Sequence, residues 1–125
     1  MNTVIINPSD SLRKFQETFE REYPFLKVEF FRGEHEVGEL SIDREKVDIN
    51  SVFSNAAALT ELLEVNLSPE ITVAEFEQSF RKLPNLGIQV YRKSGRVYLE
   101  TATTDEWTLE EQNTKGKEMS EPVID

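Results

Sequence analysis

Residues 3–32 read TVIINPSDSLRKFQETFEREYPFLKVEFFR, and residues 64–92 read EVNLSPEITVAEFEQSFRKLPNLGIQVYR. The two stretches match at an offset of 61 residues, which becomes 60 after a single-residue gap. A self-similarity of this length predicts two copies of one structural unit. The matching residues are Val4 with Val65, Pro8 with Pro69, Ser11 with Thr72, Phe15 with Phe76, Phe19 with Phe80, Val28 with Ile88, Phe31 with Tyr91 and Arg32 with Arg92.

The first copy has the pattern strand, helix, strand. Thr3–Ile6 is a short β-branched run that ends before Pro8, and Ser9 or Asp10 is available to cap a following helix. Apolar residues then recur at spacings of three and four, which predicts an amphipathic helix. Pro24 ends this helix, and apolar side chains alternate along Phe25–Arg32, as in a strand with one buried face.

The second copy repeats this order of elements. Leu62–Leu67 alternates as a strand, and Thr72 with Glu75 fits a capping box at the start of the next helix. Leu86–Arg92 alternates again and predicts the closing strand. The second copy therefore predicts the same three elements as the first.

The chain continues beyond the second copy. Lys93-Ser94-Gly95 predicts a tight turn into a further strand over residues 97–101. Residues 108–113 predict a short helix, with Thr108 and Glu111 as a second capping box. We therefore expect a single domain over residues 1–113 and a flexible polar tail over residues 114–125.

The segment between the copies gives the weakest signal. Residues 33–38 resemble an exposed loop. Asn55–Leu63 has strong helix propensity, which competes with the strand that the repeat predicts for Leu62–Leu67. We expect a short helix that gives way to a strand near Glu61.

Together these elements predict an α+β fold. Two consecutive strand–helix–strand units favour a ferredoxin-like arrangement, in which one antiparallel sheet has both helices on one face. An extra C-terminal hairpin strand and a short helix would extend that sheet. A β-grasp-like sheet with one principal helix is the alternative if the repeat arose by chance.

The charge of the chain limits its partners. The formal net charge is −10, which disfavours general binding to nucleic acids. No apolar run is long enough for a membrane span, and the N-terminus lacks the basic-then-apolar pattern of a signal peptide. The chain has no cysteine, which excludes disulfides and thiolate metal sites. We expect a small acidic protein of the cytoplasm that binds neither nucleic acid nor membrane.

No motif for catalysis is present. His35 is the sole histidine, and it stands in an acidic loop with no second histidine to complete a zinc shell. No serine lies in a glycine elbow, and the five glycines are scattered and do not form a phosphate-binding loop. We therefore expect no enzymatic activity, no cofactor and no metal.

Two groups of residues are candidates for a binding surface. The basic hairpin residues Arg92, Lys93 and Arg96 could hold an acidic partner segment. Phe31, Tyr91 and Tyr98 fall on the sheet face that points away from the helices, where they would form an exposed aromatic patch. Cover by the C-terminal helix carrying Trp107 is the alternative for this patch.

These features favour a non-catalytic protein-interaction or regulatory module. It would bind a protein partner, or a second copy of itself, through the free sheet face or a sheet edge. A small-ligand sensor that acts as a dimer is the first alternative. An acidic mimic of nucleic acid, which the net charge permits, is the second.

Overall fold

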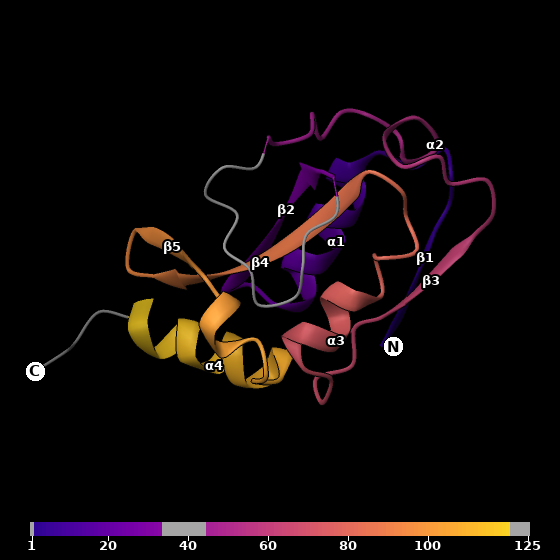
Figure 1. Ribbon diagram of the computed structural model, residues 1–125. Coiled ribbons are helices and arrows are strands. Elements are labelled where there is room, and N and C mark those ends of the chain that lie inside the picture. Colours follow the sequence, from indigo (N-terminus) through magenta and orange to yellow (C-terminus); the bar gives the residue numbers. More distant parts are fainter. Residues whose placement is uncertain (1, 34–44, 121–125) are drawn as a thin grey trace, which may run out of the picture.

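The computed structural model describes residues 2–33 and 45–120. These residues form a mixed α+β structure with two antiparallel sheets and four α-helices (Figure 1). No described helix is both long enough and apolar enough to cross a membrane. The strands are β1 (Thr3–Ile6), β2 (Leu26–Arg32), β3 (Leu63–Asn66), β4 (Leu86–Ser94) and β5 (Val97–Glu100). The helices are α1 (Leu12–Glu22), α2 (Phe53–Ala56), α3 (Val73–Gln78) and α4 (Leu109–Ser120), with a 3₁₀ turn at Ala102–Thr104.

The strands form two sheets. One is the pair β1–β3, and the other has the order β2-β4-β5. The α+β class is as predicted, but the described strands do not form the single ferredoxin-like sheet. In a ferredoxin-like sheet the second and fourth strands lie at opposite edges, whereas here β2 and β4 pair directly over seven residue pairs. The β-grasp-like alternative, with one principal helix, does not describe this arrangement either.

The lengths of the strands explain this division. Pro8 and Pro69 follow β1 and β3 closely, and proline ends a ladder because it has no amide donor. Both strands therefore have only four residues. The longer β2 and β4 satisfy more backbone groups by pairing with each other. Figure 1 shows them side by side through the middle of the molecule, with β1–β3 and β5 at opposite ends.

The predicted helix starts are mostly correct. The capping boxes at Thr72–Glu75 and Thr108–Glu111 both form. The α1 cap is Ser11, whose hydroxyl accepts from the Lys14 amide at 3.2 Å, and not Ser9 or Asp10. Ser11 is the residue that matches Thr72 in the repeat, so the cap predicted at Thr72 also indicates a cap at Ser11.

Two predicted boundaries need correction. The short helix expected before Glu61 is α2, which already ends at Ala56, because Ala58 takes a positive φ of 53° that a continuing helix does not allow. The C-terminal helix continues to Ser120, so residues 114–120 are helical and not part of a tail. Buried Leu109, Gln112 and Gly116 give α4 a face that packs on β4.

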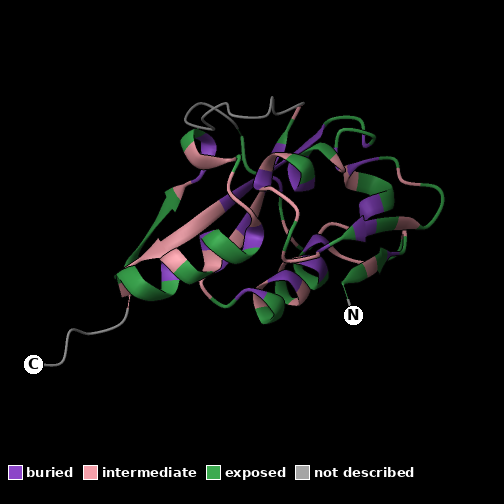
Figure 2. Ribbon diagram, turned by 90° about the horizontal axis from the view of Figure 1, so that it is seen from below, coloured by how far each residue is buried: buried purple, intermediate pink, exposed green. Residues whose placement is uncertain are grey.

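The core is built around phenylalanine rings between the helices and the inner face of the sheet. Phe15 and Phe76 stack with their centroids 6.3 Å apart, and Phe30 of β2 meets Phe15 edge-on. Figure 2 shows buried residues on the inward sides of the helices. The completely or almost completely buried aromatic side chains of this cluster are Phe15, Phe19, Phe30, Phe53, Phe76 and Phe80.

The strand registers match the offsets that the sequence shows. In the β1–β3 pair, Val4 lies opposite Val65, its own partner at an offset of 61. In the β2–β4 pair, Glu29 lies opposite Gln89, its partner at an offset of 60. In the β1–β3 and β2–β4 pairs, an approximate twofold axis therefore passes between equivalent residues.

The same correspondence extends to α2 and α4. The Phe53 amide donates to the Asp10 carbonyl at 3.0 Å, and the Leu109 amide donates to the Ile71 carbonyl at 2.9 Å. Ser11 forms an isolated antiparallel β-bridge with Val52, and the matching Thr72 forms one with Thr108. These bonds place α2 against the first copy in the way that α4 lies against the second.

Candidate functional site

Strand β5 is the most exposed regular element of the sheet. Val97, Tyr98 and Leu99 retain 57%, 36% and 44% of their accessible surface. Among the described residues β5 pairs only with β4, so its other side is a sheet edge. In Figure 1 it lies at the outer end of the molecule, and in Figure 2 it is coloured as exposed over most of its length. Three consecutive apolar residues on an edge are unusual, because such edges promote association.

The turn before β5 fixes which backbone groups face outward. Gly95 has a φ of +64° at the first position of the two-residue turn Gly95–Arg96, as a type II′ hairpin requires. The Lys93 amide donates to the Phe25 carbonyl at 2.9 Å, on the β2 side and away from β5. Lys93 lies opposite Tyr98, so this is a non-hydrogen-bonded pair. The N–H and C=O groups of Tyr98 therefore point to the free edge.

The outer face of the sheet carries a cation between two tyrosines. The Lys27 ammonium lies 4.4 Å from the centroid of the Tyr98 ring and 5.5 Å from that of Tyr91. It also lies 3.3 Å from Glu29, which pairs with Lys46 at 3.0 Å. The partly exposed tyrosines thus form a polar aromatic surface and not a bare apolar one.

Two predicted members do not take part in the exposed surface. Phe31 was expected on the exposed face, but it retains only 2% of its accessible surface, so its expected exposure is wrong. Phe31 forms an isolated antiparallel β-bridge with Lys46, beside the outer edge of β2. The alternation of apolar residues in β2 could not reveal this neighbour. Arg92 was expected at the basic hairpin tip. Its guanidinium instead donates to Gln112 of α4 at 3.0 Å, on the inner side of the sheet.

The remaining predicted residues do lie near one another. Tyr91 and Lys93 are partly exposed on β4, while Arg96 and Tyr98 are exposed on the hairpin. Lys93 is directly opposite Tyr98 in the β4–β5 register. The Tyr91 hydroxyl lies 3.4 Å from the Glu100 carboxylate. The hairpin thus has basic residues at its tip and an acidic residue at the far end of β5.

The predicted cover by the C-terminal helix is not seen on this face. Arg92 lies between Tyr91 and Lys93 on β4, so its side chain points to the opposite face. There it donates to Gln112 of α4, and its guanidinium carbon lies 5.5 Å from the centroid of the Trp107 ring. Helix α4 therefore lies on the inner side of the sheet, with the core. The tyrosines are on the opposite side.

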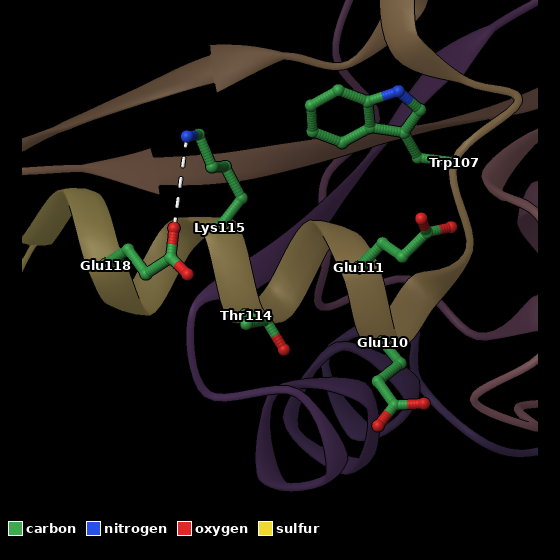
Figure 3. A pocket seen from close by; sticks show the side chains of 6 residues that line it. All are labelled: Trp107, Glu110, Glu111, Thr114, Lys115 and Glu118. Atoms are coloured by element: carbon green, nitrogen blue, oxygen red, sulfur yellow. Dashed lines mark ion pairs between the residues drawn. The ribbon is translucent and has the colours of Figure 1, made fainter.

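A hollow of about 390 Å³ lies along α4 (Figure 3). Figure 3 shows the Trp107 indole and the Lys115 side chain on the same side of the helix, while Glu110 and Thr114 point to another side. Lys115 forms a 3.9 Å ion pair with Glu118. One indole wall and several carboxylates would suit a small cationic group. The residues that line the hollow are Trp107, Glu110, Glu111, Thr114, Lys115 and Glu118.

Glu77 is a buried acid that the sequence did not single out. It retains 5% of its accessible surface, and its Oε2 accepts from the Val90 amide at 3.0 Å. The pKa of Glu77 is raised to about 8, mainly by burial; the Val90 hydrogen bond lowers it, and the nearby acids Asp105 and Glu100 contribute smaller increases. Val73 is four residues earlier on the same helix, and this spacing was the available signal that Glu77 faces inward.

The described residues contain no candidate metal centre. No group of three or more His, Cys, Asp or Glu side chains in the described parts of the chain could hold a metal ion. His35 lies outside the described residues. The arrangements that the structure does offer are a strand edge, a tyrosine-bearing face and the hollow on α4.

Comparisons with known proteins identified no relative of this chain. No protein-family model, curated protein or solved structure was found to match this chain. The functional inference that follows therefore depends on the geometry of the chain itself.

Proposed function

We propose that this protein is a non-catalytic interaction module that binds an extended partner strand along β5. The observation that carries this proposal is the exposed run Val97-Tyr98-Leu99 on a sheet edge. An incoming strand would pair with the outward backbone groups of Tyr98, and its alternate side chains would contact Val97 and Leu99. Such strand addition draws its affinity from main-chain hydrogen bonds and its specificity from side chains.

The surroundings of β5 support a rigid binding surface. Gly116 of α4 lies so close to Phe25, the residue before β2, that a Cβ there would be 2.9 Å from the Phe25 carbonyl oxygen. The Gln112 amide nitrogen donates to the Thr104 carbonyl and hydroxyl at 2.8 Å each, which ties α4 to the segment after β5. The hairpin tip is also held, since the Gly95 amide donates to the Ser120 hydroxyl at 3.3 Å. A preorganised edge loses less entropy when it binds.

We also propose that the chain contains a duplicated strand–helix–strand unit followed by a helix. The coincidence of the sequence offsets with the registers of Val4–Val65 and Glu29–Gln89 supports this proposal. The exposed β5 hairpin follows the second copy, so the proposed binding role belongs to that half of the chain.

Selection of peptides from a random library tests the interaction function. We expect selected peptides to be extended, to bind the wild-type chain and to lose binding to Leu99→Lys. The matched control is Leu62→Lys, since Leu62 is also exposed, at 62%, but lies outside the sheet edge. Equal binding to wild type and Leu99→Lys would contradict the proposal.

A small-ligand sensor is the second candidate, and the hollow beside Trp107 favours it. Its volume of about 390 Å³ lies within the range that small-molecule sites occupy. Trp107 is the sole tryptophan, so its fluorescence reports directly on occupancy. Saturable quenching by a small organic cation, absent in Glu118→Gln, would support a sensor. No change with any cation of a metabolite panel would contradict it.

A further inference from the structure

The β5 edge is complementary to itself, and we infer that its partner is a second copy of this chain. This inference rests on the proposed interaction function and names the partner. In the dimer, the two β5 strands would pair antiparallel about a twofold axis through Tyr98. The two three-stranded sheets would then become one six-stranded sheet.

The backbone permits this register. The Tyr98 N–H and C=O point outward because Lys93, opposite Tyr98, directs its own amide to Phe25 on the other side. Two copies of Tyr98 can therefore exchange both hydrogen bonds as a hydrogen-bonded pair on the axis. A register shifted by one residue would present backbone groups that already face β4.

The side chains fit the same register. With Tyr98 on the axis, Val97 of one copy lies opposite Leu99 of the other on the inner face. Both are exposed in the single chain, at 57% and 44%, and apolar cross-strand pairs stabilise a sheet. Tyr98 lies opposite Tyr98 on the outer face, next to the Lys27 ammonium. One pairing thus brings all three exposed residues of the edge into cross-strand contacts.

The charges favour an antiparallel copy over a parallel one. Arg96 lies in the turn before the exposed run, and Glu100 ends the strand opposite Tyr91. In the antiparallel dimer each Arg96 would lie opposite Glu100 of the other copy. A parallel pairing would instead place Arg96 next to Arg96, which is unfavourable. The edge of this chain therefore carries the charge pattern that its own copy complements.

Sedimentation equilibrium over a wide concentration range tests the dimer. The mass should rise from 14.4 kDa towards twice that value, because a short edge gives a reversible dimer and not a permanent one. Arg96→Glu should weaken association about tenfold or more, and Arg96→Glu with Glu100→Arg should restore it. A double variant as weak as the single variant, or a monomeric wild type at every concentration, would overturn the inference.

A crosslink tests the register. The chain has no cysteine, so a disulfide in Tyr98→Cys can join only the two introduced thiols. Paired residues on the axis have Cα atoms about 5.5 Å apart, within disulfide range. We expect rapid oxidation to a covalent dimer for Tyr98→Cys and slow oxidation for the exposed control Leu62→Cys. Equal rates would contradict the register.

The two proposals fail in different ways. A monomeric chain whose selected peptides still depend on Leu99 would overturn the dimer and leave the interaction function standing. A monomeric chain whose peptides bind Leu99→Lys equally well would overturn both.

Discussion

The rings of Phe15 and Phe76 stack with their centroids 6.3 Å apart and their planes 12° from parallel. Phe15 has the same position in the first strand–helix–strand stretch that Phe76 has in the second. Phe15 also meets Phe80 at 5.3 Å, as Phe76 meets Phe19 at 5.1 Å. The ring contacts across the centre are thus nearly symmetric. A core of this kind ties the two halves into one unit.

Phe15→Leu and Phe76→Leu should therefore lower the free energy of unfolding by similar amounts, about 1–3 kcal/mol each. Because the rings touch, the double variant should show a coupling energy of about 0.5–1.5 kcal/mol. Urea unfolding of both single variants and the double variant measures this. The control pair is Phe53→Leu with Phe76→Leu, which share no ring contact and should be additive. Additivity for Phe15 with Phe76 would contradict the stacked arrangement.

Glu77→Gln should stabilise the protein at alkaline pH. The folded pKa of about 8 exceeds the ordinary value of 4.5, so folding retains a proton that the unfolded chain releases. The contribution of Glu77 to stability is full below pH 4.5 and is lost as the pH rises to 8. Glutamine keeps an acceptor for the Val90 amide and does not ionise.

We expect the variant to match wild type near pH 5 and to exceed its free energy of unfolding by roughly 2–4 kcal/mol near pH 8. Urea unfolding across this pH range measures the difference. The exposed Glu64→Gln removes the same formal charge and serves as the control for the change in net charge alone. A Glu77→Gln protein that is less stable at pH 8 would show that the carboxylate is stabilising in its charged form.

Gly116→Ala should destabilise α4 although alanine is the better helix former. The added Cβ would lie 2.9 Å from both the Cβ and the carbonyl oxygen of Phe25, and the backbone oxygen cannot move easily. The expected net loss is about 1–2 kcal/mol, since overpacking outweighs the helix propensity gained. Exposed Thr114→Ala on the same helix should be neutral or slightly stabilising. Thermal unfolding that shows Gly116→Ala above wild type would refute the close packing of α4 on Phe25.

Gly95→Ala should cost about 1 kcal/mol, because φ is +64° at this position although nothing lies within 4 Å of the added Cβ. Gly95→Asn should cost less, since asparagine tolerates this conformation better than alanine. Denaturant midpoints of the two variants give the comparison. Alanine and asparagine variants of equal stability would argue against the type II′ turn that orients β5.

The repeat allowed most of the elements to be predicted, but not how the strands are arranged. Offsets such as Phe15 to Phe76 identify equivalent residues, and the helix starts at Ser11 and Thr72 follow from them. Local patterns do not say whether β2 pairs with β3 or with β4, because their alternation suits either neighbour. Strand pairing depends on the whole chain, and this is why the predicted single sheet became two.

The candidate site was predicted in part for the same reason. Alternation predicted Tyr91 and Tyr98 on the outer face, and both lie there beside the Lys27 ammonium. It failed for Phe31, which is buried next to Lys46, since a strand pattern does not show what covers a face. Arg92 was misplaced because its charge suggested exposure, whereas Gln112 and Trp107 of the C-terminal region bind it. Long polar side chains can be buried when partners are supplied.

Amide hydrogen exchange at Tyr98 tests the central claim most directly. Leu99 alternates with Tyr98 along β5 and points its amide towards β4, so it serves as the internal reference. We predict that Tyr98 exchanges quickly in dilute protein and becomes protected as the concentration rises or as a selected peptide is added, while Leu99 stays protected throughout. A Tyr98 amide that exchanges at the same rate under all these conditions would contradict a partner strand on β5.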